Sequence, residues 1–110
     1  MRYSTFATDS VTKYHSSGVH FEAVVRSSSI QPMSVSLFHF EAGGTLGEHV
    51  APSWQLFAVV SGQVRVSADA DRMTLQAGDA VEWGPGESHE SFAAVESTVL
   101  ILQGPEPFLT

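Results

Sequence analysis

The sequence predicts an all-β protein that forms one domain. Short segments rich in Val, Phe and Thr follow one another closely, and glycine or polar clusters separate them. No apolar repeat of 3.6 residues lasts long enough to indicate a helix. The length of 110 residues suits a single core. Many short strands at this spacing are typical of a sandwich or barrel. The expected strands are residues 19–25, 33–40, 55–60, 63–67, 72–75, 80–83, 89–93 and 98–103.

Turn residues separate the strands in the middle of the chain. Residues 61–62, 68–71 and 76–79 are short runs of Gly, Ser, Asp, Ala and Gln between apolar segments, and they predict hairpin turns. Beyond the first of these turns, Val64 and Val66 alternate with polar residues. We therefore expect these two valines to face the core and their neighbours to face solvent.

Two strands carry apolar side chains on both faces. In the strand 33–40, Val35 and Leu37 alternate with Phe38 and Phe40, and residues 99–102 are apolar without interruption. A strand of this kind needs cover on its second face. We expect a homodimer, and coverage by the terminal segments of the same chain is the alternative.

Charge and composition narrow the classes of partner. Twelve acidic residues against five scattered basic ones give a net charge of −7, which disfavours nucleic acid and anionic membranes. No apolar run approaches the ~20 residues of a membrane helix, and the start of the chain lacks the apolar stretch of a secretory signal. We expect a soluble, cytoplasmic protein. Because the chain has no cysteine, any metal must be bound by nitrogen and oxygen.

Two glycine-framed segments each lead to a histidine. Residues 43–49 end in His49, and residues 78–89 contain a Gly-Pro-Gly turn and end in His89. Histidines that follow turns can converge inside a β-barrel, where neutral imidazole is a common metal ligand. No Gly-x-Ser-x-Gly or phosphate-binding loop offers a competing catalytic centre.

The first segment resembles the first motif of the cupin superfamily. That motif has a glycine, five residues, His-x-His, a short gap, a glutamate, six residues and a glycine. Gly43, His49 and Gly62 match this pattern. Ala51 stands at the second histidine position and Gln55 at the glutamate position, so two of the three ligand positions depart from the motif.

The second segment is similar to the second cupin motif, which runs from a glycine through a Pro-x-Gly turn to a histidine. Gly78, Gly86 and His89 match in register. Pro85 is displaced by one position, and Ala93 replaces the asparagine that often ends the motif.

The resemblance implies a double-stranded β-helix, or jelly-roll, barrel over residues 1–110. Its motif core would be 43–93, with N-terminal strands in 1–42 and a C-terminal strand and extended tail in 97–110. It also implies a small-molecule ligand, and either a metal-dependent oxygenase, isomerase or lyase or a non-catalytic module that binds or senses a metabolite. The sequence leaves open whether the protein is an enzyme.

The departures from the motif define a neutral ligand set. Ala51 has no donor atom, and Gln55 offers an amide oxygen in place of a carboxylate. The expected metal ligands are therefore His49, Gln55 and His89. They would hold a divalent zinc, iron, nickel, copper or manganese ion with no compensating negative charge, which lowers affinity. The alternative is a metal-free pocket in which the two histidines are hydrogen-bond donors.

Aromatic residues around these ligands predict an apolar pocket of the kind that binds small organic molecules. His39 shares a strand face with Val35 and Leu37, so we expect it to be buried or interfacial and not a ligand. The residues expected to line the pocket are Phe38, Phe40, Ala51, Phe57 and Trp83.

Overall fold

The computed structural model describes residues 1–3, 7–27 and 33–109, and in them nine strands and one 3₁₀ turn. The expected strands all form, some of them longer than predicted. The strand β1 and the turn η1 were not predicted. The elements are β1 (Ala7–Ser10), η1 (Lys13–His15), β2 (Ser17–Ser27), β3 (Met33–Val50), β4 (Trp54–Ser61), β5 (Gln63–Ala68), β6 (Asp71–Gln76), β7 (Ala80–Trp83), β8 (Ser88–Ala93) and β9 (Ser97–Gly104).

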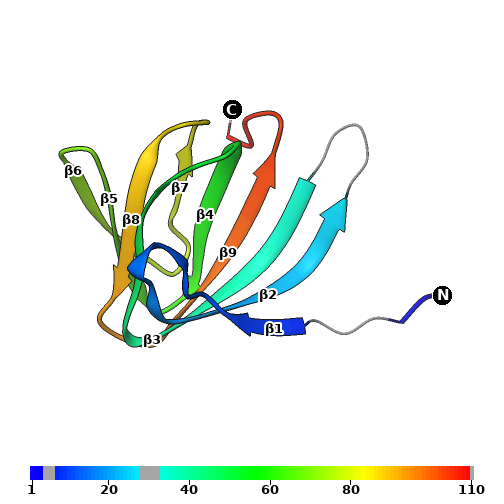
Figure 1. The fold of residues 1–110 in the computed structure, drawn as a ribbon, viewed down its shortest axis with the longest axis horizontal. Helices are drawn as coiled ribbons and strands as arrows, with labels where there is room; N and C mark the ends of the chain where they lie inside the picture. Colours follow the sequence, from blue (N-terminus) through cyan, green and yellow to red (C-terminus); the bar gives the residue numbers. More distant parts are fainter. Residues whose placement is uncertain (4–6, 28–32, 110) are drawn as a thin grey trace.

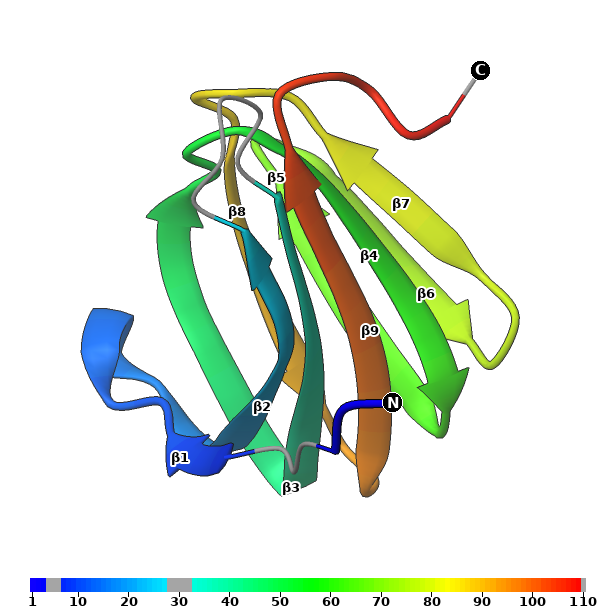
Figure 2. The same cartoon turned by 90° about the vertical axis from the view of Figure 1, so that its right-hand side faces the viewer.

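The strands form one antiparallel sheet that curves into a barrel (Figures 1 and 2). Its order is β6-β5-β8-β3-β9-β4-β7, and β2 adds to β3 with β1 at its far edge. This architecture confirms the all-β jelly-roll prediction. In the described part of the chain, no helix has the length and apolar character needed to span a bilayer.

The long strand β3 joins the two halves of the barrel. Its first part lies between β2 and β9, where Leu37 is the register partner of both Glu22 and Leu100. Its second part pairs with β8, and the register shifts between Leu46 and His49. The prediction that this strand ends at residue 40 is therefore wrong, and His49 lies near the end of a continuous strand instead of after a turn.

Two glycines explain why β3 bends without ending. Gly43 has a φ of 83°, a conformation that is strained for other residues. A Cβ at Gly44 would meet the carbonyl oxygen of Gly18 at 2.5 Å. In the sequence this glycine pair indicates a turn, but in the fold it permits a bend and a close approach of β2.

The core lies inside the barrel. Alternate residues along the strands face it, as expected from the sequence. Val64 and Val66 are buried, while Arg65 between them is exposed. The outer face of β3, β9 and β4 carries a second apolar set, which is partly exposed in the monomer. Its two cross-strand rows are Leu37, Leu100 and Ala58, and Val35, Leu102 and Leu56.

Candidate functional site

A cavity of about 820 Å³ lies inside the barrel. The inward faces of β3, β4, β8 and β9 form most of its wall, and residues 9–14 close one side. The wall contains His49, Gln55 and His89. These residues lie on three different strands, so the fold brings the three expected ligands into one cavity.

The two histidines are neighbours across the β3–β8 pair. His49 and His89 are register partners, and their ring centroids are 4.5 Å apart. The Nδ1 of His49 is 2.7 Å from the carbonyl oxygen of Gly47, and the Nδ1 of His89 is 3.1 Å from that of Glu87. Because a carbonyl oxygen only accepts, each Nδ1 carries a proton, and in a neutral imidazole of this tautomer the lone pair is on Nε2. This tautomer suits a metal ligand.

Aromatic stacking fixes both imidazoles. The Trp83 ring stacks on His89 at 3.8 Å with an interplanar angle of 7°, and Phe57 contacts Trp83 edge to face at 5.2 Å. Tyr14 stacks on the other histidine, His49, at 4.5 Å and 13°. The four rings of Tyr14, His49, His89 and Trp83 therefore form a continuous array, and its central pair belongs to the cavity wall.

Burial keeps one of these imidazoles uncharged. His89 is 3% exposed, and this desolvation lowers its pKa from 6.5 to about 4. The neighbouring His49 lowers the pKa as well, while the hydrogen bond to the carbonyl of Glu87 opposes the shift. His89 is therefore neutral at physiological pH, as a metal ligand must be.

Gln55 supplies an acceptor that needs a partner. Its side chain is 4% exposed, and its Oε1 has no hydrogen-bond partner among the described residues. Leaving a buried acceptor unpaired is costly, so this atom is suited to a ligand donor or a cation. The glutamates beside the histidines, Glu48 and Glu90, are exposed and point away from the cavity.

These donors fit a divalent ion held by two imidazole nitrogens and one amide oxygen. In the part of the chain that the structure describes, no three His, Cys, Asp or Glu side chains gather into a metal-binding group. Gln55 is the candidate for a third protein ligand, because its buried Oε1 lines the same cavity and has no partner among the described residues. Such an ion would keep its full charge and leave positions open to a small molecule.

The expected pocket-lining residues separate into two groups. Phe38 and Phe57 lie in the cavity wall. Phe40, Ala51 and Trp83 are packed in the core outside it, with exposures of 1%, 1% and 4%. Trp83 lies behind His89 because the stacked imidazole covers it from the cavity side.

Sequence reasoning missed several wall residues. Gln103 is the register partner of Gln55, and alternation along β9 with Val99 and Ile101 would have placed it inward. Tyr14 has no comparable signal. Its position depends on the N-terminal segment folding back over β3, which periodicity does not reveal.

The remaining strand histidines lie outside the cavity, on the outer face of β2 and β3. His39 is partly exposed, contacts Glu22 through Nε2 and lies 3.3 Å from the Thr98 hydroxyl through Nδ1. His20 lies beside it and pairs with Glu41 at 2.7 Å. His39 is therefore only half-buried, and both histidines have carboxylate partners.

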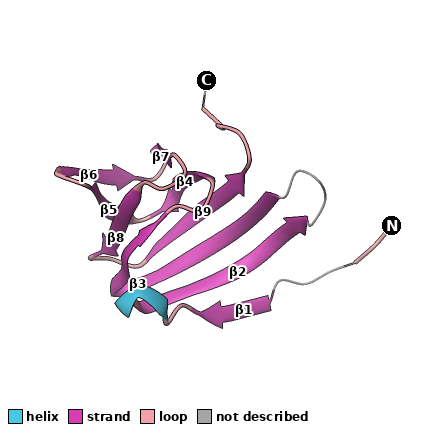
Figure 3. Ribbon diagram, turned by 45° about the horizontal axis from the view of Figure 1, so that its top comes forward, coloured by secondary structure: helices cyan, strands magenta, loops and turns pink. Residues whose placement is uncertain are grey.

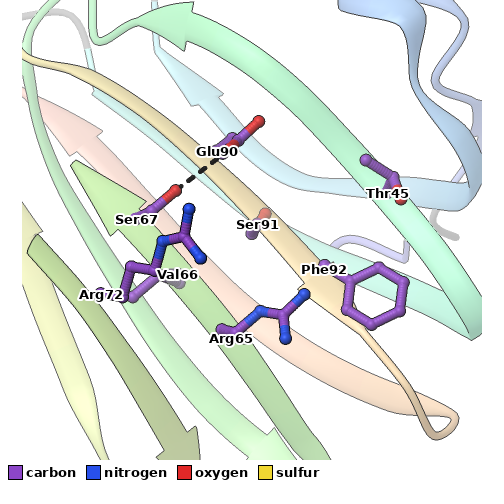
Figure 4. A pocket seen from close by; sticks show the side chains of 8 residues that line it. All are labelled: Thr45, Arg65, Val66, Ser67, Arg72, Glu90, Ser91 and Phe92. Atoms are coloured by element: carbon purple, nitrogen blue, oxygen red, sulfur yellow. Dashed lines mark hydrogen bonds between the residues drawn. The ribbon is translucent and has the colours of Figure 1, made fainter. Parts of the chain in front are cut away.

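A second, smaller hollow of about 260 Å³ lies on β5, β6 and β8 (Figure 4). Arg65 and Arg72 both line it, so the fold gathers two cations that are scattered in the sequence. The Arg65 guanidinium lies 5.0 Å from the Phe92 ring centroid. The Ser67 hydroxyl donates to Glu90 at 3.2 Å. This hollow contains none of the residues of the histidine cavity.

Solved structures share this fold at low sequence identity. A cupin-2 domain protein from Rhodospirillum rubrum is 14% identical with a TM-score of 0.76, over 96% of this chain and 74% of its own. KdgF from Halomonas sp. is 22% identical with a TM-score of 0.72, over 81% and 80% of the two chains. A cupin superfamily protein from Desulfitobacterium hafniense DCB-2 is 18% identical with a TM-score of 0.73, over 80% and 78%.

The family comparison agrees with the fold. A search of curated protein sequences gave no significant match. The family model described as Cupin domain (Cupin_2) matches residues 36–102, which is more than half of the chain and contains both histidine segments. The chain therefore belongs to the cupin domain family.

Proposed function

We propose that the protein binds a small molecule in the barrel cavity, at a divalent metal ion held by His49, Gln55 and His89. The observation that carries the proposal is the pair of adjacent imidazoles, each with its Nδ1 fixed by a backbone carbonyl. Both Nε2 lone pairs are then available in the same cavity as a buried amide oxygen that has no partner among the described residues. A divalent cation is a ligand that would use all three donors.

The cavity wall indicates how a ligand would be held. Phe38, Phe57 and Ile101 offer apolar surface, and Gln103 and Ser36 offer neutral hydrogen-bonding groups. A bound ion would supply Lewis acidity toward an oxygen of the ligand. This wall suits a molecule with an apolar body and a metal-seeking oxygen. An oxygenase, isomerase or lyase reaction is compatible with such a site.

The alternative is a metal-free binding module in the same cavity. The absence of a donor at Ala51 and of a carboxylate at Gln55 favours it, because both changes weaken metal affinity. In that case Gln55 Oε1 would accept a hydrogen bond from the ligand, and the two histidines would orient it.

Metal analysis of protein purified without an affinity tag tests the proposal. The wild type should carry or take up about one equivalent of a divalent transition metal, while His49→Ala and His89→Ala should lose it. His39→Ala is the matched control, because His39 is a strand histidine outside the cavity. Negligible metal in the wild type, or equal metal in all four proteins, would contradict the metal site.

A ligand screen by thermal shift then distinguishes the metal site from the metal-free binding module. A compound that stabilises the wild type with and without metal supports the metal-free module. A compound that stabilises only the metal-loaded protein supports the metal site. Turnover of that compound would establish an enzyme.

We also propose that the outer apolar face of β3, β9 and β4 pairs with a second copy of the chain. Support comes from its two apolar cross-strand rows, which are only partly covered in the monomer. Leu100 lies in one row, between Leu37 and Ala58. In light scattering, Leu100→Glu should convert a dimer to a monomer, whereas a monomeric wild type would contradict this proposal.

A further inference from the structure

The N-terminal arm, defined as residues Asp9 to Tyr14, forms one side of the histidine cavity. All six of its residues belong to the wall. Figure 3 shows the 3₁₀ turn that contains Tyr14 lying against one end of β3, with β1 beside it. The arm therefore covers the cavity at the point where His49 lies.

The arm carries the strongly charged groups of the wall. Asp9 and Lys13 are the charged lining residues among those described, and the remaining wall is built of apolar, amide, hydroxyl, phenol and imidazole groups. Both charged side chains are exposed, so they lie on the solvent side of the cavity. The rest of the wall offers shape and neutral hydrogen bonds.

The end of the arm is held in a strained conformation. Tyr14 has a φ of 60° and a ψ of 30°, and His15 follows with a φ of 56°. Left-handed conformations are unfavourable for residues with a Cβ, and they persist where the surrounding structure imposes them. Two in succession place the Tyr14 ring flat against His49, with an interplanar angle of 13°.

The second half of β3 packs closely against this turn. A Cβ at Gly47 would collide with the Tyr14 carbonyl oxygen and lie 2.8 Å from its carbonyl carbon. The backbone N–H of Gly47 donates to the Ser16 hydroxyl at 3.1 Å. Gly47 also accepts the hydrogen bond from His49 Nδ1, so one residue holds both the arm and the imidazole.

We propose that Tyr14 is a positioning and specificity-determining residue of the cavity. Its ring holds the His49 imidazole in place and limits access to it, and the arm selects the ligand by its size and charge. This inference rests on the proposed function, because it takes the cavity to be a ligand-binding site. The contact between Tyr14 and His49 is nevertheless testable without metal or ligand.

The test measures how fast diethyl pyrocarbonate acylates each histidine of the metal-free protein, resolved by peptide mass spectrometry. Tyr14→Gly removes the ring and relieves the left-handed strain, while Tyr14→Phe keeps the ring. Tyr3→Gly is the matched control, because Tyr3 is 89% exposed and outside the cavity wall. His39, on the outer face, is the internal reference.

In Tyr14→Gly, His49 should react about fivefold faster than in the wild type, the factor that corresponds to a stacking contact of about 1 kcal/mol. Tyr14→Phe and Tyr3→Gly should match the wild type, and the reference histidine should react equally in all four proteins. The melting temperature of Tyr14→Gly should change little, because relief of the left-handed strain offsets the lost stacking contact. A lower melting temperature together with faster acylation of every histidine would show a general loosening of the fold and contradict a specific contact with His49.

Equal His49 reactivity in the wild type and Tyr14→Gly would overturn the inference, even if the wild type binds metal. Conversely, faster acylation in Tyr14→Gly in a protein that binds no metal would refute the metal site and leave the role of Tyr14 intact. Where metal does bind, the same variant should bind cobalt(II) faster and more weakly, while Tyr3→Gly should not.

Discussion

Acidification should destabilise the fold through His89, since burial lowers its pKa from 6.5 to about 4. Below pH 6.5 the unfolded chain takes up a proton at this residue while the folded protein does not, so the unfolded state is favoured. The contribution of His89 to the free energy of unfolding is therefore complete above pH 6.5 and decreases as the pH falls toward 4. Below pH 4 this group causes no further loss. The pKa difference corresponds to a total of about 3 kcal/mol. At pH 5 the loss is about 2 kcal/mol, a large share of a typical folding free energy.

Urea denaturation of the metal-free protein at pH 7 and pH 5 measures this loss. The comparison protein is His89→Phe, which keeps a ring against Trp83 and has no titrating group at this position. The drop in unfolding free energy between the two pH values should be about 2 kcal/mol larger in the wild type, because other titrating groups largely cancel between the proteins. An equal drop in both would refute the burial argument. Titration of the His89 imidazole by NMR gives the folded-state pKa directly.

Three further substitutions test the site and its support. Gln55→Glu should raise divalent-metal affinity by at least about tenfold in calorimetric titration, because a carboxylate offsets the charge of the ion; unchanged affinity would remove residue 55 from the ligand set. Trp83→Ala should cost about 3–5 kcal/mol in urea denaturation by emptying the space behind His89, and a loss below about 1 kcal/mol would contradict the stacking support. Gly62→Ala should cost more than about 1 kcal/mol, since Gly62 has a φ of 84° and its Cβ would meet the carbonyl oxygen of Glu96 at 2.5 Å; an unchanged denaturation midpoint would contradict that geometry.

Strand positions could be predicted because alternation and turn residues are local signals. Val64 and Val66 face the core as expected, and the turn at Gly62 lies between β4 and β5. The length of β3 could not be predicted, because Gly43 and Gly44 are equally consistent with a turn and with a bend. Only the approach of β2 to this strand distinguishes them.

For the site, the resemblance of the two glycine-framed segments to the cupin motifs singled out His49, Gln55 and His89, and the structure places all three in the wall of one cavity. The ring that covers His49 was not predictable, because Tyr14 reaches it through a left-handed turn more than thirty residues earlier in the chain. Trp83 was expected to line the pocket, and in the structure it is buried in the core. Its burial behind an imidazole, outside the cavity wall, depends on side-chain packing that alternation does not resolve.

In the proposed site, His49, Gln55 and His89 together hold one divalent ion. Anomalous diffraction from crystals soaked in cobalt(II) or zinc(II), recorded at the metal absorption edge, tests it most directly. One peak should appear about 2.0–2.2 Å from the Nε2 atoms of both histidines, with the Gln55 Oε1 as the third protein ligand. The absence of a peak at these imidazoles, in crystals that take up the ion elsewhere, would contradict it.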